Sequence, residues 1–236
     1  MPQIRLITFD LDNTLWDVHS VIINAEATMR AWLAEHVPVY GQQIDTQQVQ
    51  QLRSSAVNEN PALAHDVSAL RKAVLQRAFV VCGYQEKAAH ALSQQAFNVF
   101  FEARQQVVFF PGALTMLEEL AGEFHLGALT NGNADINAVG LGQYFSFAFS
   151  SADVGVSKPA PDMFHAALRH AGVDAADTIH VGDNLVDDIA GAGQLGIHTI
   201  WTNHADVSPG ERDHAPTAIV SHLEELPAAV ELIRSR

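Results

Sequence analysis

The chain has 236 residues, of which 48% are hydrophobic and 17% charged, as in a globular protein that buries a core of its own. Its formal net charge of −14 argues against broad binding of nucleic acid, which needs a basic surface. No apolar run approaches the roughly 20 residues of a membrane span, we expect no secretory signal, and the single cysteine excludes an intramolecular disulfide, so we expect a cytoplasmic protein.

Short apolar runs predict six strands, at 4–10, 124–130, 145–150, 178–182, 197–202 and 218–220. From residue 112 onward they alternate with helical stretches at 112–121, 159–171 and 187–195, each of which ends at a glycine. Strands without internal polar alternation, separated by helices, are typical of parallel sheets covered on both faces. We therefore predict an α/β fold with a Rossmann-like parallel sheet.

Residues 17–107 break this pattern, because they contain helical stripes and no convincing strand. Val21, Ala25, Met29 and Trp32 recur at helical spacing, and further stripes run over 70–81 and 92–100. Asp45 with Gln48 forms the signature of a capping box that opens another helix. This segment is nearly neutral whereas the rest of the chain is strongly acidic. We predict a core of residues 1–16 and 108–236 with a helical domain, 17–107, inserted into it.

Side chains that could act in catalysis or ligand binding occur where four of the predicted strands end or shortly after them. They are Asp10, Asp12, Thr130, Asn131, Lys158, Asp183 and Asp188. The carboxyl ends of parallel strands meet at one edge of a sheet, which is where open α/β sheets bind their ligands. We therefore expect these side chains to form one site.

The same residues give the chain its resemblance to a known family, the haloacid dehalogenase superfamily. Four motifs match in order: Asp-x-Asp-x-Thr at 10–14, Thr-Asn at 130–131, Lys158 before Pro159, and Gly-Asp-x-x-x-x-Asp at 182–188. The position of the helical insert, between the first two motifs, is similar to that in the helical-cap (C1) subclass. The resemblance implies a HAD-like core, with 17–107 as a helical cap.

The residues themselves are suited to phosphoryl transfer, which needs a nucleophile, charge neutralisation and a proton donor. Asp10 can attack phosphorus and give an aspartyl-phosphate, and Asp12 can protonate the leaving alcohol and later deprotonate water. Thr130 and Lys158 can bind phosphoryl oxygens. Crowded carboxylates call for a cation, and Mg²⁺ is the one that suits an all-oxygen site.

The resemblance also implies how the metal and the phosphate are held. Asp10 and Asp183 would ligate Mg²⁺ through their side chains and Asp12 through its carbonyl oxygen. Asp188 would support the metal or Lys158, and Asn131 would join in phosphate binding. The substrate would be a small phosphorylated metabolite; the oligomeric state is left open.

Residues 130–134, 140–145 and 180–183 resemble a bacterial branch that acts in riboflavin biosynthesis, on flavin mononucleotide or 5-amino-6-(5-phospho-D-ribitylamino)uracil. Such a substrate needs a pocket with apolar walls. We expect Trp16 to supply one, and Trp32 and Phe101 to pack in the helical core or to serve as further walls. His180, inside a predicted strand, is expected to be a core histidine.

Several alternatives share this fold. A 2-haloacid dehalogenase would use the same nucleophile, but by the resemblance such enzymes lack the second acid of the first motif, so Asp12 counts against it. A sugar-phosphate or phosphoglycolate phosphatase remains open, and a phosphonate hydrolase would need a cap lysine in a recognisable position. An inactive binding protein is the non-enzymatic alternative, and the intact set of acids, threonine and lysine argues against it.

Overall fold

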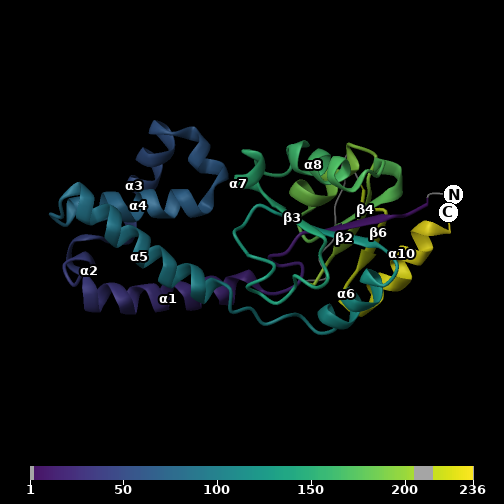
Figure 1. Cartoon of the computed structure of the whole chain (residues 1–236), viewed down its shortest axis with the longest axis horizontal. Helices are drawn as coiled ribbons and strands as arrows, with labels where there is room; N and C mark the ends of the chain where they lie inside the picture. Colours follow the sequence, from purple (N-terminus) through teal and green to yellow (C-terminus); the bar gives the residue numbers. More distant parts are fainter. Residues whose placement is uncertain (1–2, 205–214, 236) are drawn as a thin grey trace. The chain divides into compact units, whose positions relative to one another are not determined.

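The computed structural model describes residues 3–204 and 215–235. The chain divides into two compact units (Figure 1). The first, here the core unit, comprises Met1–Asp17 and Val107–Arg236, and the second, the helical unit, comprises Val18–Gln106. The chain thus leaves the core unit soon after its first strand and returns to it before its second.

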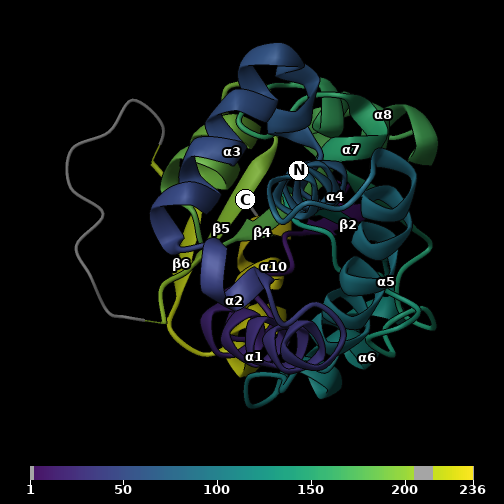
Figure 2. The ribbon, with the colours of Figure 1, turned by 90° about the vertical axis from the view of Figure 1, so that its left-hand side faces the viewer.

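The core unit is built on a six-stranded sheet in the order β3-β2-β1-β4-β5-β6, in which every pairing is parallel. In Figure 2 the labels β6, β5, β4 and β2 follow one another in this order, and β1 pairs with β4 on one side and β2 on the other. The strands are β1 (Leu6–Phe9), β2 (His125–Thr130), β3 (Phe147–Ser150), β4 (Thr178–Gly182), β5 (His198–Thr202) and β6 (Ala218–Val220). The predicted parallel α/β sheet is confirmed. β1 and β4 are buried throughout because they lie at the centre of the sheet.

Helices cover both faces of this sheet. In Figure 1, α8 (Asp162–Ala171) lies on one side, and α6 (Ala113–Ala121) and α10 (Leu226–Arg234) lie on the other. Phe164 of α8 packs with Leu6 and Leu129 in a hydrophobic cluster that joins the helix to the strands. Shorter elements lie between strands and these helices: α7 (Ser151–Val154) and η2 (Ala175–Asp177) before and after α8, and η4 (Leu223–Glu225) before α10.

The segment after β4 differs from the helix predicted at 187–195. It begins earlier, as a π-helical stretch, η3 (Leu185–Ala190), followed by the short helix α9 (Gly191–Gly193). Asn184 starts the wide turn, because its side chain accepts from the N–H groups of Val186 and Asp187 and its carbonyl accepts from Ile189 at 3.2 Å. Such wide turns are frequent at functional sites.

The helical unit contains α1 (Val18–His36), α2 (Tyr40–Gln43), α3 (Thr46–Glu59), η1 (Pro61–His65), α4 (Val67–Val81) and α5 (Glu86–Arg104). α1 and α4 both pack on α5 around Met29, Phe79 and Phe100. Arg71 adds a polar tie, since its guanidinium pairs with Glu26 and lies 3.6 Å above the ring of Phe100. In the described part of the chain, no helix is long and apolar enough to cross a membrane.

The capping box predicted at Asp45 is confirmed. Its carboxylate accepts from the N–H of Gln48, and the Gln48 side chain accepts from the N–H of Asp45, each at 2.8 Å. Asp45→Ala should therefore weaken the start of α3 by about 1 kcal/mol. Hydrogen exchange of the α3 amides measures this, with Gln47→Ala in the same turn as a matched control. Equal exchange in the two variants would contradict the assignment.

Candidate active site

The buried ammonium of Lys158 lies at the centre of the site. Its Nζ lies 2.8 Å from Asp10 Oδ1, 2.6 Å from Asp188 Oδ1 and 2.7 Å from the carbonyl oxygen of Leu129. An ammonium has three hydrogens to donate, so these oxygens use all of them. Lys158 therefore pairs with two carboxylates at once, and any phosphoryl oxygen that it binds must replace one of these partners.

Asp10 directly follows β1 and continues its ladder, because its N–H donates to the carbonyl of Val181 at 2.8 Å. Lys158 holds one carboxylate oxygen and Thr14 Oγ1 lies 3.3 Å from the other. The same hydroxyl lies 3.4 Å from Asp183 Oδ1, so Thr14 stands between two acids. The chain can turn this sharply after Asp10 because Asn13 adopts a left-handed conformation with φ of 64°, which asparagine tolerates.

Three of the four predicted acids come together. Oxygens of Asp10, Asp183 and Asp188 lie within 4.8 Å of one another, a donor set of the kind that Mg²⁺ prefers. Asp188 is the least available of the three, since it already accepts from Lys158, from His180 and from the N–H of Asn184. A cation would therefore be held mainly by Asp10 and Asp183, with Asp188 behind them.

Gly182 lets the strand approach the Asp188 carboxylate closely. A Cβ at this position would lie 2.3 Å from Asp188 Cγ, well inside van der Waals contact. The glycine of the fourth motif therefore has a steric role: it makes room for the acid that follows six residues later.

Thr130 and Asn131 lie at the end of β2, as predicted, but their side chains make different contacts. Thr130 Oγ1 accepts from the N–H of Gly132 at 2.8 Å, so its own hydrogen can be donated to a phosphoryl oxygen. The Asn131 carboxamide instead forms two hydrogen bonds with the backbone of Lys158. It accepts from the N–H of Lys158 at 2.8 Å and donates to its carbonyl at 3.0 Å. Asn131 Nδ2 also lies 3.3 Å from Asp187 Oδ2. Its side chain therefore positions the lysine.

Trp16 is not a wall of a substrate pocket, and that expectation is wrong. The side chain has no exposed surface, and its ring packs edge-on against Phe109 with the ring centroids 5.8 Å apart. Its Nε1 donates to Asp12 Oδ1 at 2.8 Å. The indole therefore fixes the orientation of the predicted general acid. Trp32 and Phe101 pack against the core of the helical unit.

The electrostatics of the site show an excess of negative charge. Burial, together with Asp188 and Asp183, outweighs Lys158 and raises the pKa of Asp10 to about 8. Burial and the charge of Asp188 raise the pKa of Asp183 to about 6. Burial alone would raise the pKa of Asp188, but Lys158 and His180 outweigh it and lower that pKa. One lysine does not balance these carboxylates, so the site is suited to a divalent cation.

Sequence reasoning missed several supporting contacts. It did not foresee the Leu129 carbonyl on Lys158, the grip of Asn131 on the Lys158 backbone or the bond from Trp16 to Asp12. Of these contacts, only the one between Trp16 and Asp12 joins residues close in the sequence, since they are four positions apart.

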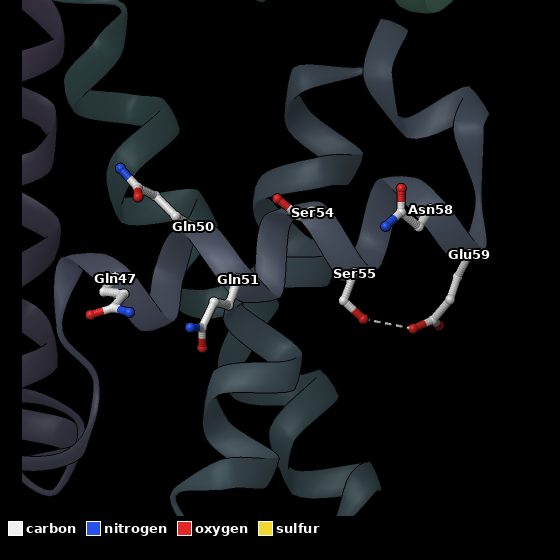
Figure 3. A pocket seen from close by; sticks show the side chains of 7 residues that line it. All are labelled: Gln47, Gln50, Gln51, Ser54, Ser55, Asn58 and Glu59. Carbon is white, nitrogen blue, oxygen red and sulfur yellow. Dashed lines mark hydrogen bonds between the residues drawn. The ribbon is translucent and has the colours of Figure 1, made fainter.

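An open hollow of about 580 Å³ on the helical unit is lined by none of these residues. It is lined along one face of α3 by Gln47, Gln50, Gln51, Ser54, Ser55, Asn58 and Glu59 (Figure 3). The figure shows Ser55 bonded to Glu59, a bond within one helix. A polar stripe of this kind is typical of a hydrated helix face.

The fold and the site together define a hydrolase of the haloacid dehalogenase type. The family model described as haloacid dehalogenase-like hydrolase matches residues 4–196, and the chain belongs to this family.

Individual relatives carry different activities in their names. The chain is 31% identical over 201 residues to 5-amino-6-(5-phospho-D-ribitylamino)uracil phosphatase YigB of Escherichia coli, covering 85% of this chain and 84% of the relative. A solved structure of a 2-haloacid dehalogenase from Pseudomonas syringae is 43% identical, with a TM-score of 0.94 over 97% of this chain and 99% of that one. The HAD-hydrolase YfnB of Bacillus subtilis, solved bound to magnesium, is 26% identical with a TM-score of 0.62, covering 96% and 98%.

The raised pKa values predict how Mg²⁺ affects stability. In the folded protein Asp10 and Asp183 hold protons up to pH values of about 8 and about 6, whereas unfolded aspartates lose them near 3.8. Stability from this site therefore falls as pH rises from about 4 to 8, and a cation that needs ionised ligands reverses the loss. Mg²⁺ should raise the melting temperature more at pH 8 than at pH 6.

Thermal melts with and without Mg²⁺ check this. Asp183→Asn should remove most of the effect, and Glu118→Gln, on the exposed face of α6, should retain it. A gain from Mg²⁺ that is the same at both pH values, or that survives in Asp183→Asn, would contradict the metal assignment.

Proposed function

We propose that the protein is a Mg²⁺-dependent phosphatase that hydrolyses a small phosphomonoester in the cytoplasm through a phosphorylated Asp10. The observation that supports this most is the cluster of Asp10, Asp183 and Asp188 around a single lysine. A phosphate dianion is repelled by such a cluster unless a cation is bound, whereas displacement of a halide by a carboxylate needs none. When bound, Mg²⁺ supplies charge neutralisation for the phosphoryl oxygens.

The residues of this chain divide the reaction between them. A carboxylate oxygen of Asp10 attacks phosphorus, the bond to the leaving oxygen breaks, and Asp12 donates a proton to the departing alcohol. A water molecule then attacks the same phosphorus, Asp12 takes its proton, and phosphate leaves with Asp10 restored. Thr130 donates to a phosphoryl oxygen, and the backbone N–H of Asn131 serves the same purpose.

Asp12 supports the assignment to phosphoryl transfer. It is only half-buried, so its carboxyl can reach a substrate, and Trp16 Nε1 holds one of its oxygens. A proton on this carboxyl is therefore directed to the other oxygen, Oδ2. A haloacid has no leaving alcohol to protonate and would leave such a group without a role.

For the substrate we propose a phosphate of flavin metabolism, flavin mononucleotide or 5-amino-6-(5-phospho-D-ribitylamino)uracil. Support comes from the Escherichia coli relative, whose name states the second of these substrates. We further propose that residues 17–107 act as the cap domain that selects the leaving group, since the core motifs serve the phosphate alone.

A second candidate activity is 2-haloacid dehalogenation, favoured by the 43% identity to the Pseudomonas syringae protein. In that reaction Asp10 would displace halide from carbon to give an ester, and water would attack the Asp10 carbonyl. The two reactions thus leave oxygen from solvent water in different places: in the phosphate product or in the Asp10 carboxylate.

The role of Asp12 predicts a dependence on the leaving group. Asp12→Ala should slow hydrolysis of an alkyl phosphate at least about tenfold more than that of p-nitrophenyl phosphate, since nitrophenolate departs without a proton. Asp10→Asn should abolish both activities, because an amide is a poor nucleophile. Steady-state rates measure both, with Glu118→Gln as a control. An equal loss on the two substrates would exclude Asp12 as the general acid.

A substrate panel separates the two candidate activities. The flavin-pathway phosphates should be hydrolysed with kcat/KM at least about tenfold above sugar phosphates and phosphoglycolate, about 1.4 kcal/mol in transition-state binding. In water labelled with a heavy oxygen isotope, the phosphate product should acquire the label and the peptide that contains Asp10 should stay unlabelled. Release of chloride from 2-chloropropionate, with label in Asp10, would contradict the phosphatase proposal and support the dehalogenase. If sugar phosphates ranked first, only the proposal of a flavin-pathway substrate would be excluded.

A further inference from the structure

We propose that His180 is a positioning residue of this active site: its imidazole, held by Thr8, fixes the Asp188 carboxylate that holds Lys158 against Asp10. The inference rests on the proposed function, in which Lys158 and Asp10 face the substrate. His180 itself is fully buried and is one of the central residues of β4. It therefore acts through other residues.

The imidazole is held on one side by the neighbouring strand. The register of β1 and β4 pairs Thr8 with His180, and Thr8 Oγ1 lies 2.9 Å from His180 Nδ1. Phe164 of α8 meets the ring edge-on, with centroids 5.0 Å apart and an interplanar angle of 86°. The hydrogen bond and the packing together leave the ring one orientation.

The other ring nitrogen contacts the site. His180 Nε2 lies 3.2 Å from Asp188 Oδ1, the same oxygen that accepts from Lys158. An ionised carboxylate only accepts, so Nε2 carries the hydrogen and Nδ1 accepts from the Thr8 hydroxyl. The second Asp188 oxygen accepts from the N–H of Asn184 at 3.0 Å. Donors thus hold both oxygens of Asp188.

These contacts form one continuous row from the centre of the sheet to the nucleophile: Thr8, His180, Asp188, Lys158 and Asp10. A rotation of the Asp188 carboxylate would carry the Lys158 ammonium with it. Groups that orient the residues of a site from behind commonly affect activity 10- to 100-fold. A histidine that served only to fill space could be replaced by any ring of its size without this loss.

Four variants separate positioning from packing. His180→Phe keeps a ring but removes the donor, His180→Gln keeps an N–H group near the Nε2 position, and Thr8→Val removes only the hydroxyl. Thr199→Val is the matched control: Thr199 pairs with His180 from β5, but its hydroxyl bonds to the N–H of Thr217.

With p-nitrophenyl phosphate, His180→Phe should lower kcat about 10- to 100-fold and change KM by less than about threefold. His180→Gln should recover most of the loss, Thr8→Val should fall between them, and Thr199→Val should match the wild type. Equal kcat values for the Phe and Gln variants, or losses that follow the melting temperature across all four, would overturn the proposal.

The nitrogen NMR signals of the imidazole give a readout that needs no turnover. The wild type should show the hydrogen on Nε2, and Thr8→Val should keep it there but shift the Nδ1 signal, because Nδ1 loses the hydroxyl that it accepts from. A hydrogen on Nδ1 in the wild type would overturn the inference. A wild-type protein that hydrolyses no phosphomonoester would overturn the proposed function instead, and the ring signals would then decide the His180 contact on their own.

Discussion

The site depends on the ion pairs and the hydrogen bond that the buried ammonium of Lys158 makes with three oxygens. This ammonium joins oxygens from Asp10 just after β1, from β2 and from η3, and these lie up to 148 positions from the lysine in the sequence. A buried charge is costly unless it is paired and fully hydrogen-bonded, so the three segments are held where they meet it. Asn131 fixes the backbone of the same lysine, and the fold thereby sets the position of the nucleophile.

The same lysine leaves the site incomplete in charge. Its single positive charge offsets only part of the negative charge of Asp10 and Asp188, and Asp183 adds a further carboxylate. Lys158 therefore does not outweigh burial and the neighbouring carboxylates, which raise the pKa values of Asp10 and Asp183. A divalent cation would satisfy these carboxylates and admit a phosphate. This charge requirement favours phosphoryl transfer, even though the solved structure with 43% identity is named a 2-haloacid dehalogenase. That similarity spans 97% of this chain, so the preference for phosphoryl transfer rests on single residues such as Asp12.

Much of the architecture could be predicted from the sequence because its signals are local. Apolar runs predicted the strands, apolar stripes at helical spacing predicted most helices, and the Asp45 capping box needs only residues three apart. The candidate site residues followed from one rule, that parallel strands end at a common edge. Asp10, Lys158 and Asp188 do meet there.

The remaining contacts depend on register and on atomic packing, which no local pattern encodes. Thr8 and His180 are 172 positions apart and touch only because β1 pairs with β4 in one register. Asn131 has the residue type of a phosphate ligand, but its carboxamide is taken up by the Lys158 backbone. Trp16 has the residue type of a pocket wall, but its buried ring packs against Phe109 and its Nε1 donates to Asp12.

In the proposed reaction Asp10 becomes phosphorylated during turnover, and chemical trapping of the phosphorylated aspartate tests this step. The enzyme is mixed with a substrate and Mg²⁺, quenched with acid and treated with borohydride, which reduces an aspartyl-phosphate to homoserine. Mass spectrometry of the peptide that contains residue 10 should then show homoserine at that position, only when substrate was present. An unmodified Asp10 in an enzyme that is turning over, or homoserine at another aspartate, would exclude Asp10 as the nucleophile.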